Sequence, residues 1–103
     1  MAAPLPDVRF HDAEILALRL SREGPTLELD FEIAARLPET RPITVRFIGV
    51  DELEVGGVNE QNVVFDLTAE FRADGRFDVV LDASYGLGGR FSCERIEFRD
   101  RAS

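Results

Sequence analysis

The residues best suited to chemistry stand near the start of the chain, in the run His11-Asp12-Ala13-Glu14. An imidazole beside carboxylates can bind a metal ion or act as a general acid or base. On an extended backbone, however, His11 points to one side while Asp12 and Glu14 point to the other. The chain holds only 1 His and 1 Cys, which excludes an all-His or Cys-rich zinc site. We expect His11 and Asp12 to hold a turn and a sheet edge through hydrogen bonds; the alternative is a small metal- or acid-dependent enzyme using His11 with Asp12 or Glu14.

Nucleophilic catalysis has less support. No serine lies in a nucleophile-elbow sequence, and His11 is the only imidazole available as a base. Cys93 stands in phase with Phe91, and no neighbouring pattern would activate its thiol, so we expect a small core residue. We predict that the chain is not an enzyme and uses no metal or other cofactor.

Two loops concentrate polar groups suited to recognition. The segment Gly56–Asn62 carries the amides of Asn59, Gln61 and Asn62, and the segment Ser84–Gly89 places Tyr85 beside glycines. Neither segment is a phosphate loop, because the Lys and the following helix are missing. Amide side chains that bond their own loop explain most of this composition. A protein-recognition surface is the alternative, since Tyr and amides are typical of interfaces.

Acidic residues dominate the charge, and the formal net charge of the 103 residues is -8. Such a surface repels phosphate backbones and anionic lipids, so we expect neither nucleic acid nor a membrane as partner. The length predicts one domain over residues 1–103. The first residues contain neither a signal peptide nor a membrane anchor, and the single Cys fits a reducing compartment, so we expect a cytoplasmic protein.

Alternation of apolar and polar residues predicts strands. Thr26–Ile33 puts Leu and Phe on one face and the stripe Glu28, Asp30 and Glu32 on the other, where Arg19 and Arg46 would partly neutralise it from adjacent strands. Paired acids such as Asp78 and Asp82 fit the same structural explanation better than acid–base catalysis.

Turn residues divide the chain into hairpins. Ile15–Leu20 and Thr26–Ile33 flank the turn Ser21–Pro25, and Val63–Phe71 and Phe77–Ala83 flank the turn Ala73–Arg76. Within Val63–Phe71 we expect one face to hold Val63, Phe65, Leu67, Ala69 and Phe71.

The remaining segments are less regular. The prolines predict a loop over 34–42, with a strand from Ile43 and a bend at Gly49 before a shorter strand over 50–55. A last strand over 91–98 changes its apolar phase, which a bulge near Glu94 would absorb.

These elements predict an all-β protein, an antiparallel meander of about six to seven strands that forms a small barrel or sandwich. One short helical turn over 6–12 is compatible with the pattern. The one-sided apolar faces need a cover, either within the chain or from a second copy, so a homodimer is an alternative assembly.

Three segments together resemble small bacterial proteins of the immunity protein 50 type: His11–Ile15, Asn59–Asp66 and Ser84–Cys93. The likeness spans roughly residues 11–98. The resemblance implies a non-enzymatic binding protein that neutralises a bacterial toxin domain by direct contact. It marks as candidate partner-binding positions His11, Asp12, Glu14, Asn59, Gln61, Asn62 and Tyr85. As an alternative within this hypothesis, the chain contacts the toxin through its acidic sheet face.

Overall fold

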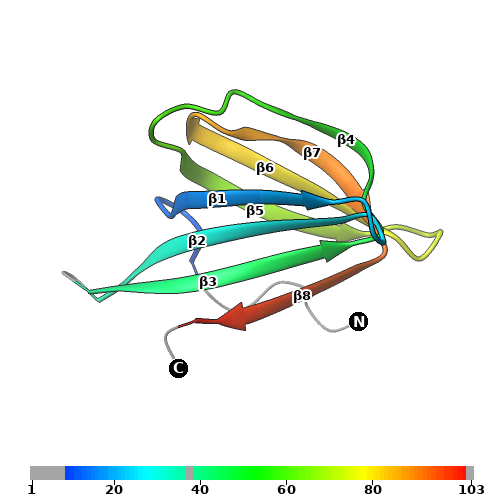
Figure 1. Cartoon of the computed structure of the whole chain (residues 1–103), viewed down its shortest axis with the longest axis horizontal. Helices are drawn as coiled ribbons and strands as arrows, with labels where there is room; N and C mark the ends of the chain where they lie inside the picture. Colours follow the sequence, from blue (N-terminus) through cyan, green and yellow to red (C-terminus); the bar gives the residue numbers. More distant parts are fainter. Residues whose placement is uncertain (1–8, 37–38, 102–103) are drawn as a thin grey trace.

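The computed structural model describes residues 9–36 and 39–101 (Figure 1). Over these residues the chain is all-β, with eight antiparallel strands in one sheet of order β4-β7-β6-β5-β1-β2-β3-β8. The all-β prediction is confirmed, and the strand count is slightly higher than expected. The strands are β1 (Glu14–Ser21), β2 (Thr26–Arg36), β3 (Glu39–Ile48), β4 (Asp51–Gly56), β5 (Val63–Phe71), β6 (Phe77–Tyr85), β7 (Gly88–Cys93) and β8 (Arg95–Asp100).

The sheet is not closed, and β4 and β8 form its two edges. It folds over itself as two layers, one of β1, β2, β3 and β8 and one of β4, β7, β6 and β5 (Figure 1). We call these the front and back layers. The only paired residues between β1 and β5 are Glu14 and Val63. The core lies between the layers, where the rings of Phe47 on β3 and Phe91 on β7 are 4.9 Å apart.

A corner joins the layers at the other end. Ile48 pairs with Arg95, and three residues further along each strand Asp51 pairs with Ser92, so the ladder keeps its register through the bend. In place of the bulge expected near Glu94, the chain bends at this residue between β7 and β8. The N–H of Glu94 donates to the carbonyl of Ile48 at 2.8 Å. The apolar phase changes there because the chain passes from one layer to the other.

Both predicted hairpins are confirmed, with Ser21 opposite Thr26 and Phe71 opposite Phe77. The loop predicted over 34–42 is wrong, because β2 extends to Arg36 and β3 begins at Glu39. Pro42 pairs with Glu32, and its carbonyl accepts from the N–H of Arg101 at 2.9 Å, on the side away from β2. Since the N–H and C=O of a strand residue point to the same side, the missing donor of Pro42 costs the β2 ladder nothing.

The predicted inner face of β5 is wrong at Phe65. Irregularities around Val64 shift the register against β6, so Val64 is fully buried and the side chain of Phe65 is 52% exposed. Leu67 returns to the core. A bulge places one extra residue in a strand, and here it reverses which side of the sheet the two neighbours occupy.

The core otherwise follows the alternation. Leu27, Leu29, Phe31 and Ile33 are buried, as is Cys93, and burial raises the pKa of the Cys93 thiol to about 11. Of the helical turn expected over 6–12, residues 6–8 lie outside the described residues, and His11 and Asp12 form a turn. No helix within the described ranges is long and apolar enough to cross a membrane.

Candidate functional site

The seven candidate residues gather at one end of the sheet, at the left of Figure 1. Glu14 at the start of β1 pairs with Val63 at the start of β5, and Val63 pairs with Tyr85 at the end of β6. The two polar loops and the His-Asp turn lead directly into this row. We call the group of His11, Asp12, Glu14, Asn59, Gln61, Asn62 and Tyr85, together with the exposed Phe65, the polar end.

A tight turn enters β1. The N–H of Ala13 donates to the carbonyl of Phe10 at 2.9 Å, and Asp12 sits between them with a φ of 67°. A positive φ at the third residue is the signature of a type II turn, a position that Asp tolerates better than most residues. The N–H of Asp12 donates to the carbonyl of Val64 at 2.8 Å, so the turn is fixed on β5. The carboxylate of Asp12 stays largely exposed.

His11 packs against the ring of the exposed residue Phe65. Its Nδ1 donates to the carbonyl of Phe65 at 2.8 Å, and the two rings meet edge to face with centroids 5.3 Å apart. Because a carbonyl can only accept, Nδ1 carries a proton, which leaves Nε2 3.6 Å from a carboxylate oxygen of Asp12. Across the part of the chain that the structure describes, no three His, Cys, Asp or Glu side chains are grouped to hold a metal ion. This geometry suits a positioned ring better than a metal ligand.

Asn62 joins the two polar loops. Its Oδ1 accepts from the N–H of Asn59 at 3.0 Å and from the N–H of Leu87 at 2.8 Å, and its Nδ2 donates to the carbonyl of Asn59 at 3.0 Å. Gly86 packs so closely that a Cβ there would lie 2.7 Å from the carbonyl oxygen of Gln61. The amide of Asn62 therefore serves the loop structure.

Asn59 and Tyr85 form the outer part of the same network. Asn59 Nδ2 donates to the hydroxyl of Tyr85 at 3.0 Å, and Asn59 Oδ1 accepts from the N–H of Glu60 at 2.8 Å. The side chain of Tyr85 is nevertheless 55% exposed. Gln61 is exposed as well. The sequence analysis did not predict that Phe65 is exposed. Three consecutive apolar residues, Val63, Val64 and Phe65, allow either Val64 or its two neighbours to face the core.

The outer surface of the front layer is an ion-pair network. The guanidinium of Arg19 contacts both carboxylate oxygens of Asp30, at 2.7 and 2.8 Å, and Glu28 at 3.1 Å. Asp30 also accepts from the hydroxyl of Thr44 at 2.7 Å. These bonds, that to Arg19 above all, hold the pKa of Asp30 at about 2, below its ordinary value of 3.8. The expected partial neutralisation of the β2 stripe is confirmed.

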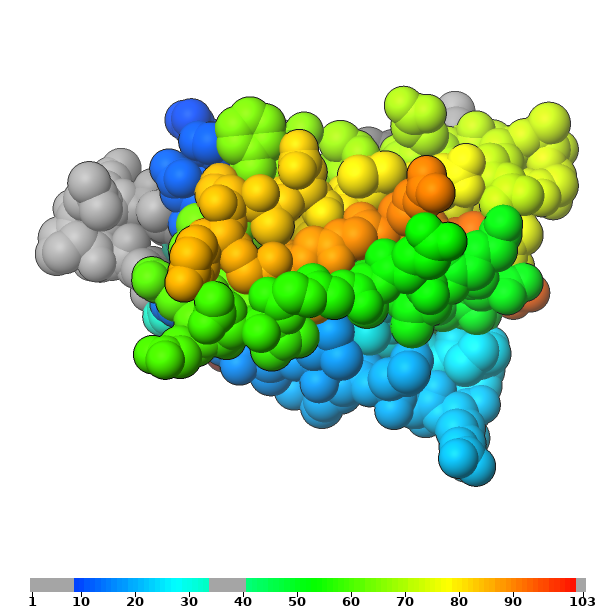
Figure 2. Space-filling model, turned by 90° about the horizontal axis from the view of Figure 1, so that it is seen from above, coloured from blue at the N-terminus to red at the C-terminus, as the bar shows by residue number. Residues whose placement is uncertain are grey.

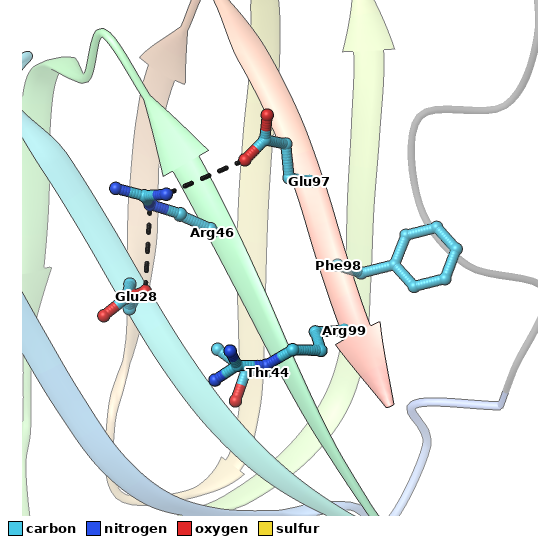
Figure 3. A pocket seen from close by; sticks show the side chains of 6 residues that line it. All are labelled: Glu28, Thr44, Arg46, Glu97, Phe98 and Arg99. Carbon is cyan, nitrogen blue, oxygen red and sulfur yellow. Dashed lines mark ion pairs between the residues drawn. The ribbon is translucent and has the colours of Figure 1, made fainter. Parts of the chain in front are cut away.

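A shallow hollow of about 160 Å³ lies on this surface (Figure 3). Its lining consists of Glu28, Thr44, Arg46, Glu97, Phe98 and Arg99. Arg46 lies 3.7 Å from Glu28 and 3.8 Å from Glu97, and the ring of Phe98 points away from both (Figure 3). Since the guanidinium of Arg46 is already shared between two carboxylates, the hollow offers little to a ligand of either charge.

The outer surface of the back layer is more acidic. Asp66 pairs with Asp82 across β5 and β6, and Glu70 pairs with Asp78. Arg72 contacts Asp78 at 3.2 Å, whereas no ion pair in the described residues involves Asp66, Glu70 or Asp82. Figure 2 shows β4, β7 and β6 side by side in the adjoining part of this layer. Val80, 44% exposed, lies in a hollow of about 480 Å³ on this surface.

Comparisons with known proteins give one match. A family model described as immunity protein 50 matches residues 6–102, nearly the whole chain. No curated protein and no solved structure matches the chain. The matched range includes the polar end and both outer surfaces.

Proposed function

The chain belongs to the immunity protein 50 family, and from this membership we propose that it neutralises a toxin domain by binding it directly through the polar end. The family assigns an immunity-type role in general. Direct binding, rather than chemical modification of the toxin, fits a site whose imidazole is committed to the carbonyl of Phe65. We further propose that the complex forms in the cytoplasm.

The observation that carries this proposal is the exposed ring of Tyr85, which amide hydrogen bonds hold in place. Tyr85 is anchored through its hydroxyl to Asn59, whose backbone is fixed in turn by Asn62. Tyr and Phe supply large contact areas and lose little conformational entropy when a partner covers them. A surface that is already rigid before binding avoids part of the ordering cost of association.

The charge of the chain indicates the chemistry of the partner. The polar end contains the carboxylates of Asp12 and Glu14, and the formal net charge of the whole chain is -8. Complementary charge speeds encounter and discriminates against wrong partners more than it adds affinity. We therefore propose a toxin surface with basic residues around an apolar centre that receives Tyr85 and Phe65.

The test compares two aromatic residues of similar exposure. Tyr85→Ala removes a side chain of the polar end, whereas Phe71→Ala removes one that is 51% exposed at the opposite end of β5. Each variant is co-expressed with a candidate toxin domain, and survival and co-purification are measured. We expect Tyr85→Ala to weaken binding by roughly 30-fold or more, as for an interface hot spot, and Phe71→Ala to leave it unchanged.

The outcomes test two claims separately: that the chain neutralises the toxin by binding, and that the polar end is the contact surface. If the unmodified chain neither binds nor protects, direct neutralisation of that toxin is wrong. If it protects but both variants bind equally well, the polar end is not the contact surface. Circular dichroism of both variants verifies that the sheet is intact.

A further inference from the structure

The sheet has a third open edge besides β4 and β8. β1 is bonded to β2 along its length, but its pairing with β5 stops at Glu14, after which the N–H of Ile15 makes one last bond to the carbonyl of Asn62. From Leu16 to Ser21 the side of β1 away from β2 therefore has no ladder partner among the described strands. Figure 2 shows the residues of β1 uncovered at the rim of the molecule.

The other two edges carry charges that oppose strand pairing. Exposed charged side chains occupy β4, with Asp51, Glu52 and Glu54, and β8, with Arg95, Glu97 and Arg99. Charged edge residues and bulges are the usual means by which soluble proteins avoid edge-to-edge association. β4 also has a register irregularity between Asp51 and Glu54.

β1 has a similar irregularity, between Ile15 and Ala17, but it lacks charges along its free edge. Its exposed residues include Leu16, Leu18 and Leu20, which are 52%, 39% and 57% exposed. The one charge between them, on Arg19, is held over β2 by Glu28 and Asp30 and so does not cover the free edge.

Two of these leucines face the core side of the front layer without being covered. Leu18 pairs with Leu29 and Leu20 with Leu27, and both partners on β2 are buried. Cross-strand partners lie on the same face of a sheet. The apolar face of the front layer therefore continues to its β1 edge, beyond what the back layer covers.

We propose that two copies of the chain associate through β1, which pairs antiparallel with β1 of the second copy about a twofold axis at Leu18. This pairing joins the two front layers into one continuous sheet. A twofold interface must be complementary to itself, and this register satisfies that requirement. Leu18 meets Leu18, Leu16 meets Leu20, and Ala17 meets Arg19, so no like charges are opposite each other.

Charge favours a second copy over a foreign basic strand at this edge. β1 from Leu16 to Ser21 contains no carboxylate, and its one guanidinium is already neutralised, so the edge offers nothing that selects a charged peptide. The acidic back surfaces lie on the other layer. Two chains of net charge -8 still repel at long range, so the dimer should become tighter as salt screens this repulsion.

The test is the molar mass in solution, measured by light scattering from low to high micromolar concentration. We expect a concentration-dependent dimer for the unmodified chain and a monomer for Leu18→Lys, which adds an edge charge of the kind that natural sheets use. The matched control is Val80→Lys, because Val80 is 44% exposed but lies on the central strand β6. Thermal unfolding verifies that both variants fold.

Hydrogen exchange locates the interface independently. The amides of residues 16–21 should exchange more slowly at high concentration, in the unmodified chain but not in Leu18→Lys. A monomer at every concentration would overturn the proposal, as would a dimer that Leu18→Lys leaves intact. If the unmodified chain is monomeric and Leu18→Lys loses toxin binding, the edge receives a toxin strand and the dimer is wrong.

Discussion

The two outer surfaces of the folded sheet arise from the same alternating sequence pattern but differ in how far their carboxylates are neutralised. On the front layer, Asp30 and Glu28 are bound by Arg19, and Arg46 lies between Glu28 and Glu97. On the back layer, Asp66 and Asp82 lie directly opposite each other. The difference depends on strand order, because the order decides whether a carboxylate meets a guanidinium or another carboxylate. The front surface contributes to stability, and the back surface carries uncompensated negative charge.

The largest expected effect comes from removing the centre of the front network. Asp30→Ala leaves the guanidinium of Arg19 and the hydroxyl of Thr44 without their shared acceptor. The side chain of Asp30 is only 13% exposed, so these charge-assisted bonds are poorly replaced by water. We expect a loss of about 2 to 3 kcal/mol in the free energy of unfolding, measured by urea denaturation.

Glu97→Ala is the control on the same layer. Its ion pairs with Arg46 and Arg95 are longer, at 3.8 and 3.4 Å, and all three side chains are about half exposed or more. Exposed pairs of this kind contribute little, so we expect a change below about 0.5 kcal/mol. Equal losses in unfolding free energy for Asp30→Ala and Glu97→Ala would show that Asp30 contributes no more to stability than an exposed residue of the same layer.

The next effect is a dependence of stability on pH. The pKa of Asp30 in the folded chain is about 2, below its ordinary value of 3.8. A lowered pKa stabilises the folded chain at pH values above the unfolded pKa, and this contribution disappears as the pH falls toward the folded pKa. We expect the unfolding free energy to fall by about 2 kcal/mol from this group between about pH 5 and pH 2.

Asp30→Asn isolates this contribution, because the amide keeps the shape of the side chain and does not titrate in this range. Its unfolding free energy should start lower at neutral pH and fall less steeply on acidification. Parallel pH profiles for the variant and the unmodified chain would assign the acid sensitivity to other carboxylates.

The strands that form these surfaces could largely be predicted from the sequence, but their order could not. Turn residues and alternation identified both hairpins, since a hairpin is a local pattern. The pairing of β3 with β8, and the passage of the chain between layers at Gly49 and Glu94, depend on contacts far apart in sequence. The loop predicted over 34–42 was wrong because the rule against proline in strands does not consider which side of the strand needs a donor.

The polar end shows the same limit. Composition alone singled out both polar loops and His11, yet their convergence depends on the pairing of Glu14 with Val63. The backbone bond from Ile15 to Asn62 links the two regions. Phe65 was assigned to the core because strict alternation was assumed through the irregularity beside Val64.

The smallest effect tests the comparison most directly, because it predicts opposite signs on the two layers. Asp82→Asn removes one of two charges that face each other on β5 and β6, so it should raise the unfolding free energy by about 0.5 kcal/mol. Glu28→Gln on the front layer removes a carboxylate bonded to Arg19 and should lower it by a similar amount, about 0.5 kcal/mol. Added salt should narrow both differences, since it screens repulsion and attraction alike. Two changes of the same sign would mean that the number of charges, and not their arrangement on the two layers, determines their effect on the stability of this sheet.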